Sequence, residues 1–136
     1  MLQDLQSSRS YVRLGHNALL NHFSLIEALI THEPTAAAGD SLNHQISTKM
    51  PLLFRRFTEP VAFPRGFETT DQKKLWKLLY GVRSRFAHGD VADFRSGQFS
   101  RLGDFQAVER FVYLALKSLL KLALHEPDLV YDLKSC

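Results

Sequence analysis

Apolar residues recur at every third or fourth position through most of this 136-residue chain, which is the spacing of an amphipathic helix. No long run alternates as a strand would. The pattern predicts four long helices and a short last helical turn, over residues 2–31, 42–57, 72–88, 105–125 and 128–133. Residues 35–40, 58–70 and 90–103, which are rich in small, polar or proline residues, are expected to be loops. We therefore predict an all-α fold, an up-and-down helical bundle of four to five main helices.

Residues suited to helix ends stand at the predicted boundaries. Ser41, Asp71 and Asp104 can each cap the start of a helix by accepting a hydrogen bond from its orphan N–H groups. Gly89 directly follows the third segment and is a natural stop. Pro51 is expected to kink or split the second helix, because proline lacks the backbone N–H. A break of the first helix near Gly15 is left open.

Length and composition indicate one globular domain, residues 1–136. Apolar residues make up 45% of the chain and charged residues 23%, as in ordinary soluble proteins. The apolar runs are too short to cross a bilayer, so no membrane contact is expected. The start, Met1–Asp4, lacks the basic and apolar pattern of a secretory signal. Cys136 is the one cysteine, which excludes an internal disulfide and a cysteine-based zinc site. We expect a cytoplasmic protein.

Positive charge is concentrated in the middle of the chain. Residues 49–85 contain nine basic and three acidic side chains, a net charge of +6, whereas the remainder carries −3. Such asymmetry is typical of a surface that faces a polyanion, although a basic segment can also be a solvated face. The candidate RNA-binding residues in this segment are Lys73, Lys74, Lys77 and Arg85.

Most familiar catalytic and metal-binding patterns are absent from the sequence. It has no glycine-rich nucleotide loop, no G-x-S-x-G and no H-E-x-x-H. His16 and His22 lie about 240° apart around one helix and so cannot share a ligand face. No metal and no cofactor are therefore expected. Glu27 falls inside an apolar stretch, where it should either point to the edge of the bundle or pair with Arg13 or Arg83.

One short stretch combines an arginine with a histidine, Arg83-Ser84-Arg85-Phe86-Ala87-His88-Gly89-Asp90. Its structural interpretation is a helix end with a glycine cap and a histidine placed favourably for the helix dipole. Its functional interpretation is a site that grips or cuts RNA. On an ideal helix Arg83 and His88 are about 140° apart, whereas Ser84 and His88 are neighbours. That geometry favours a composite site over a self-contained one.

The run from Leu78 to Gly89 resembles the R-x4-H signature of HEPN domains, especially of their ApeA-like branch. The helix containing Phe23–Leu29 is similar to the "aliphatic-Glu-Ala-Leu" helix of that branch, and an Ala- and Leu-rich helix follows the motif, as in the family. The resemblance spans about Val12 to Leu124. Ser84 stands where many active members have asparagine, and the family also contains members that bind without cutting.

The resemblance implies a metal-independent endoribonuclease with a toxin or defence role, in which Arg83, Ser84 and His88 form the catalytic site. Histidine can act as acid or base near neutral pH, and arginine offers a planar cation to phosphate oxygens. One histidine does not easily serve as both acid and base, and the homodimer that the resemblance implies would supply a second copy. A cognate antitoxin is a further implied partner. The alternative is a non-catalytic HEPN module that binds RNA or a protein.

Overall fold

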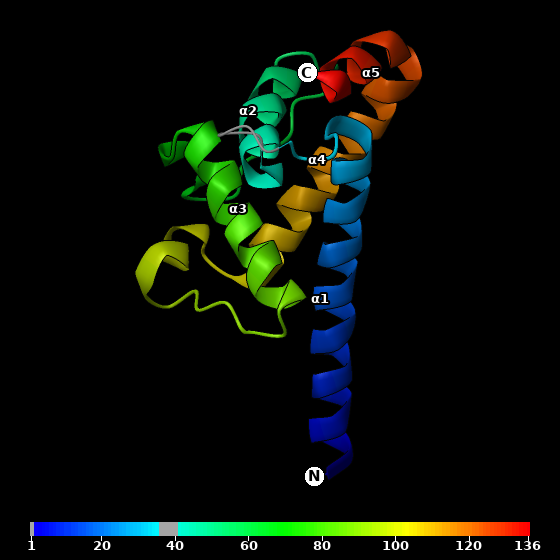
Figure 1. Ribbon diagram of the computed structural model, residues 1–136. Helices are drawn as coiled ribbons and strands as arrows, with labels where there is room; N and C mark the ends of the chain where they lie inside the picture. Colours follow the sequence, from blue (N-terminus) through cyan, green and yellow to red (C-terminus); the bar gives the residue numbers. More distant parts are fainter. Residues whose placement is uncertain (1, 36–40) are drawn as a thin grey trace.

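The computed structural model describes residues 2–35 and 41–136, with side chains from residue 15 onward (Figure 1). Its elements are α1 (Leu2–Ile30), α2 (Leu42–Phe54), the short 3-10 helix η1 (Phe67–Thr69), α3 (Gln72–Ala87), a second 3-10 helix η2 (Gly97–Leu102), α4 (Phe105–His125) and α5 (Pro127–Ser135). No strand occurs in the described ranges. The predicted all-α bundle is therefore confirmed.

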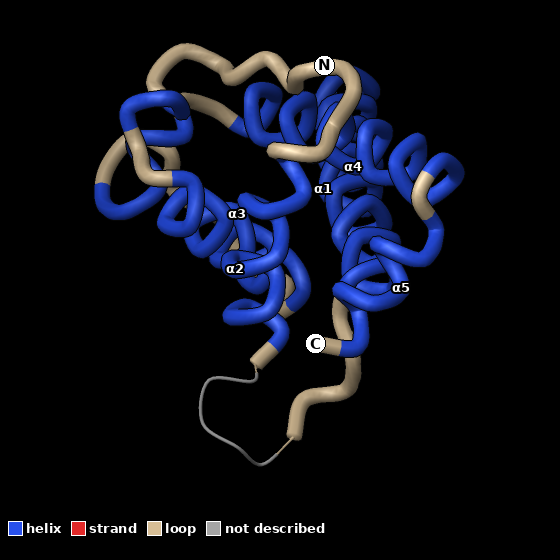
Figure 2. Tube along the Cα trace, turned by 90° about the horizontal axis from the view of Figure 1, so that it is seen from above, coloured by secondary structure: helices blue, strands red, loops and turns tan. Residues whose placement is uncertain are grey.

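The helices pack as two groups (Figure 2). α2 lies against α3, while α1 lies against α4, and α5 folds back onto both α1 and α4. The two groups meet where α1 contacts α2 and α3. Within the described part of the chain, no helix is both long and apolar enough to cross a membrane.

The predicted helix starts are confirmed in detail. The side chains of Ser41, Asp71 and Asp104 each accept a hydrogen bond from the backbone N–H three residues further on, at 3.1, 3.4 and 2.8 Å. Each of these bonds satisfies a donor that the first helical turn leaves without an intrahelical partner. The start of each of these helices is thus determined locally.

The structure shows how the helices pass through Pro51 and Gly15. Pro51 does not split α2, which runs through it and ends three residues later at Phe54 rather than at Phe57. α1 is continuous through Gly15. This glycine permits close packing instead, because an added Cβ would lie 2.9 Å from the Phe105 ring of α4. The last element was also underestimated: α5 extends beyond the predicted turn at 128–133.

The core is organised around aromatic rings from α1, α2, η1, α3 and α4. Trp76 of α3 is fully buried, with its ring 5.7 Å from Phe111 of α4, 6.0 Å from Phe54 of α2 and 6.4 Å from Phe23 of α1. Phe67 of η1 packs on Phe111 at 5.3 Å. The loops 58–70 and 90–103, predicted to be irregular, therefore contain short helices whose aromatic residues anchor them to the body.

Lys49 connects three helices from inside the protein. Only 5% of its surface is exposed, and its Nζ donates hydrogen bonds to the carbonyls of Ile30 (2.9 Å) and Lys134 (3.2 Å) and to Oε1 of Gln45 (3.3 Å). The first two acceptors belong to the C-terminal ends of α1 and α5, where a cation also interacts favourably with the helix dipoles. Lys49 therefore does not belong to the basic surface that the charge of residues 49–85 predicted.

We predict that Lys49→Met lowers the free energy of unfolding by about 2–4 kcal/mol, because it removes the hydrogen bonds that Nζ donates to one buried and one partly buried carbonyl at two helix ends. Urea denaturation followed by circular dichroism measures this change. Lys117→Met, at an exposed position of α4, is the control and should alter stability by less than about 0.5 kcal/mol. Equal effects of the two substitutions would contradict the role of Lys49.

Candidate functional site

The C-terminal end of α3 is closed by a tight glycine cap. His88 is the cap residue, and Gly89 follows in the left-handed region with φ 78°. The N–H of Gly89 donates to the carbonyl of Phe86 (3.1 Å), and that of Asp90 donates to the carbonyl of Arg85 (2.8 Å). These two bonds define a Schellman motif, which satisfies carbonyls at the helix end. The expected stop at Gly89 is confirmed, and the chain leaves the helix directly after His88.

The cap holds the imidazole of His88 at the surface in a defined orientation. Its Nδ1 lies 2.9 Å from the carbonyl oxygen of Ser84, and the residue is exposed. A carbonyl oxygen only accepts, so Nδ1 carries the hydrogen and donates it. In the neutral ring Nε2 is then the acceptor, and no described residue bonds to it. The side chain therefore offers one free nitrogen that can take or deliver a proton.

A shallow groove of about 300 Å³ surrounds His88 between the end of α3 and η2. Its lining includes the predicted residues Ser84, Arg85 and His88, together with Gly81, Asp90, Gln98 and Phe99. Ser84 contributes its backbone carbonyl to the orientation of His88. Arg85 supplies the positive charge in this groove, and Asp90 a negative one.

Arg83 lies on another face of α3. Its Nε is 3.2 Å from Oε1 of Glu27 on α1, an ion-pair distance without hydrogen-bond alignment, and its Nη2 donates to Oε2 at 3.5 Å. The guanidinium carbon lies 5.4 Å from the centre of the Tyr80 ring, within cation–π range. The side chains of Arg83 and Glu27 are 23% and 15% exposed. Pairing of Glu27 with Arg83 is thus confirmed, and Arg13 lies outside the described side chains.

Helical periodicity explains why one chain does not bring Arg83 to His88. Residues spaced by four, three and four share one stripe of a helix. Trp76, Tyr80 and Arg83 follow this spacing on the face that is buried against α1. The next stripe, about 100° around the helix, is made by Lys77, Gly81, Ser84 and His88, which line the two grooves. Lys77 and His88 are exposed, and Gly81 and Ser84 are half-buried. The large angular separation predicted for Arg83 and His88 is therefore present in the structure.

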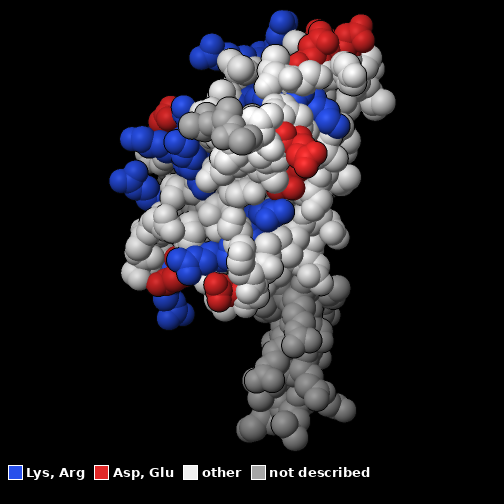
Figure 3. All heavy atoms as spheres, viewed as in Figure 1, with Lys and Arg blue, Asp and Glu red and all other residues white. Residues whose placement is uncertain are grey.

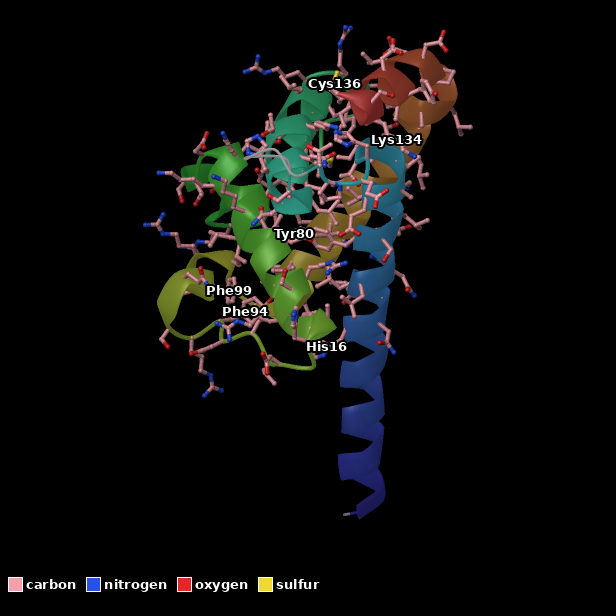
Figure 4. The ribbon with its side chains drawn as sticks, in the orientation of Figure 1. His16, Tyr80, Phe94, Phe99, Lys134 and Cys136 are labelled. Atoms are coloured by element: carbon pink, nitrogen blue, oxygen red, sulfur yellow. The ribbon has the colours of Figure 1, made fainter. Side chains whose placement is uncertain are left out.

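Aromatic side chains lie between α1 and α3 (Figure 4). Burial raises the pKa of Tyr80; the Arg83 cation lowers that pKa and the Glu27 carboxylate raises it further. His16 of α1 stacks on Phe86 with ring centres 3.9 Å apart, and burial lowers the pKa of His16. His16 is accordingly a neutral packing group near neutral pH. Figure 4 shows His16 and Tyr80 on the α1 side of α3, and Phe94 and Phe99 on its other side.

A second and larger groove, of about 660 Å³, continues along α3 from the His88 groove. The two share Gly81 and Gln98. The larger groove is lined by Asn43, Thr70, Lys74, Lys77, Leu78, Gly81, Gly97, Gln98 and Arg101. In Figure 3, lysine and arginine atoms gather on the side of the molecule where α3 lies.

The structure divides the predicted RNA-binding residues between grooves. Lys74 and Lys77 line the larger groove and Arg85 the His88 groove. Lys73 instead lines a separate groove beside Arg55. Sequence reasoning missed Arg101, which lies in a stretch expected to be a loop. The spacing of Lys77, Gly81, Ser84 and His88 is the one sequence signal for the grooved face.

Among the described residues, no group of three or more histidine, cysteine, aspartate or glutamate side chains is arranged to hold a metal ion.

Comparison with known proteins found no matching family model, no matching curated protein and no matching solved structure. The HEPN resemblance therefore stays a prediction from the motif and its helical setting.

The ion pair between Glu27 and Arg83 should stabilise the fold measurably, because both side chains are largely shielded from water. A double-mutant cycle with Glu27→Gln and Arg83→Met is expected to give a coupling free energy of about 1–2 kcal/mol in thermal or urea unfolding. The exposed pair Glu59–Lys121, at 3.3 Å with side chains 76% and 49% exposed, is the matched control. Its cycle should give less than about 0.5 kcal/mol. Similar values for the two cycles would show that Arg83 is not held in place by Glu27.

Proposed function

We propose that this protein is a metal-independent endoribonuclease of the HEPN type, with a toxin or defence role and a composite site at a homodimer interface. The observation that carries the proposal is the exposed imidazole of His88. Its Nδ1 donates a hydrogen bond to the Ser84 carbonyl. Its Nε2 bonds to no described residue, and the groove around His88 also contains Arg85. A proton-transfer group beside a cation is one half of what RNA cleavage by its own 2′-hydroxyl requires, since the reaction needs both a base and an acid.

In this reaction the 2′-oxygen attacks the adjacent phosphorus, and the bond from phosphorus to the 5′-oxygen breaks. Nε2 of a neutral His88 takes the proton of the 2′-hydroxyl. A protonated imidazole delivers a proton to the departing 5′-oxygen. The products are a 2′,3′-cyclic phosphate and a free 5′-hydroxyl. Two histidines in opposite protonation states are needed at once, so His88 of a second copy completes the site.

Two arginines are candidates to bind the oxygens of the reacting phosphate in this proposal. Arg85 already lies in the His88 groove. Arg83, which the HEPN resemblance assigns to catalysis, is engaged by the carboxylate of Glu27. Its planar guanidinium binds carboxylate and phosphate in the same geometry, so contact with RNA requires exchange of the carboxylate for a phosphate. Arg83 otherwise acts by holding α3 against α1.

A non-catalytic HEPN module that binds RNA or a protein partner is the second candidate. The engagement of Arg83 by Glu27 favours it, since the motif arginine is then unavailable to the reacting phosphate. This candidate predicts RNA binding that weakens with salt and is not followed by cleavage. A cognate antitoxin protein remains a proposed partner under the first candidate.

Incubation of the purified protein with single-stranded RNA in EDTA tests the two candidates. We predict cleavage products with 2′,3′-cyclic phosphate ends and a loss of rate of at least about 100-fold in His88→Ala, because a proton-transfer group contributes about that much or more. His125→Ala, which removes an exposed histidine at the end of α4, should cleave as the unmodified protein does. Undiminished cleavage by His88→Ala excludes His88 from the mechanism, and binding without cleavage supports the non-catalytic module.

A further inference from the structure

The larger groove beside α3 is built by the packing of η2 against a glycine. Phe99 of η2 is buried, and a Cβ added to Gly81 would lie 3.0 and 3.2 Å from two atoms of its ring. Any larger residue at position 81 would push Phe99 and its 3-10 helix away from α3. Gly81 thus allows η2 to pack close to α3 and to form the second wall of the groove. Gly81 also lies at the junction with the His88 groove.

Every charged residue described in the lining of this groove is positive. Lys74 and Lys77, one helical turn apart, project from α3, and Arg101 of η2 also lines the groove. All three are exposed, and none forms an ion pair with a described residue. Among the residues that the structure describes, no aspartate or glutamate lines this groove, whereas Asp90 and Asp71 line the grooves beside it. Cations gathered in a concave surface attract an anion more strongly than the same charges on a convex one.

The neutral lining is suited to nucleotides. Asn43, Thr70 and Gln98 supply amide and hydroxyl groups, which can both donate and accept hydrogen bonds. Leu78 and Gly81 supply an apolar floor. The Oδ1 atom of Asn43 has no hydrogen-bond partner among the residues described. The volume of about 660 Å³ is that of a pocket for one drug-sized ligand, roughly one or two nucleotides of a strand and too little for a duplex.

We propose that the groove between α3 and η2 binds the single-stranded RNA segment that adjoins the phosphate acted on at His88. This inference rests on the proposed function, and it adds the location of the strand. Lys74, Lys77 and Arg101 hold its phosphates. Gln98, which lines both grooves, contacts the nucleotide nearest to His88. Arg101 is a specific RNA-binding residue under this proposal, and Arg55 and Arg56, which lie outside the groove, are not.

Binding can be separated from cleavage with a fluorescein-labelled single-stranded 2′-O-methyl RNA, which lacks the attacking hydroxyl. Fluorescence anisotropy at low salt should show that Lys77→Ala/Arg101→Ala binds at least about tenfold more weakly than the unmodified protein. The salt dependence of log K should also become shallower by about 1.4, the value for two lost contacts to a single strand. Arg101→Lys keeps the charge and should retain most of the affinity.

Arg55→Ala/Arg56→Ala is the matched control. Like Lys77→Ala/Arg101→Ala, it removes two exposed positive charges, but at positions outside the groove. It should weaken binding by less than about threefold, because it reduces only the long-range electrostatic attraction between the protein and RNA. Melting temperatures confirm that both double variants are folded. A duplex of the same sequence, used as competitor, should displace the labelled strand poorly.

The outcomes distinguish this inference from the function on which it rests. Failure of the unmodified protein to bind RNA at low salt overturns both the proposed function and the groove. Binding by the unmodified protein that falls equally in the two double variants overturns the groove alone. Equal competition by duplex RNA overturns the assignment of a single strand. Selective loss in Lys77→Ala/Arg101→Ala, with poor competition by duplex, supports the proposal.

Discussion

The burial of Trp76 among rings from α1, α2 and α4 determines how α3 is rotated about its own axis, and the grooved surface depends on that rotation. Residues that share the Trp76 stripe, Tyr80 and Arg83, must face α1, where Glu27 neutralises the guanidinium. The neighbouring stripe, about 100° around the helix, carries Lys77, Gly81, Ser84 and His88 and lines the grooves. Hydrophobic packing thus separates the arginine and the histidine of the motif.

The helices and their caps could be predicted from the sequence, because each depends on spacing along one helix or on local hydrogen bonds. The pairing of Glu27 with Arg83 joins two helices, and the sequence left it as one of several alternatives. The buried position of Lys49 could not, since its acceptors at Ile30 and Lys134 come from distant parts of the chain. Arg101 was missed for a similar reason. The close packing of Phe99 on Gly81 brings η2 against α3, and no local sequence pattern predicts that contact. Nor does spacing along α3 alone place Trp76 at the centre of the core, where rings from α1, α2 and α4 meet around it.

The net charge counted over residues 49–85 does not all lie on the grooved face of the protein. Residues 49–85 carry +6, yet Lys49 is inside the protein, Arg83 is paired and Lys73 lines a separate groove. Lys74, Lys77 and Arg85 remain on the grooved face, where Arg101 joins them from outside the basic segment. Location on one continuous groove therefore supports RNA binding better than net charge does.

The central claim is that two copies of the chain bring their His88 side chains into one cleft. Pulsed electron paramagnetic resonance tests it with a nitroxide label at Ala87→Cys, an exposed position beside His88, in a Cys136→Ser background. A label at Glu126→Cys, at the junction of α4 and α5, is the reference. The account predicts a dimer in sedimentation and a single distance between copies that is shorter at position 87 than at position 126. A monomer, or a dimer with the longer distance at position 87, would contradict it.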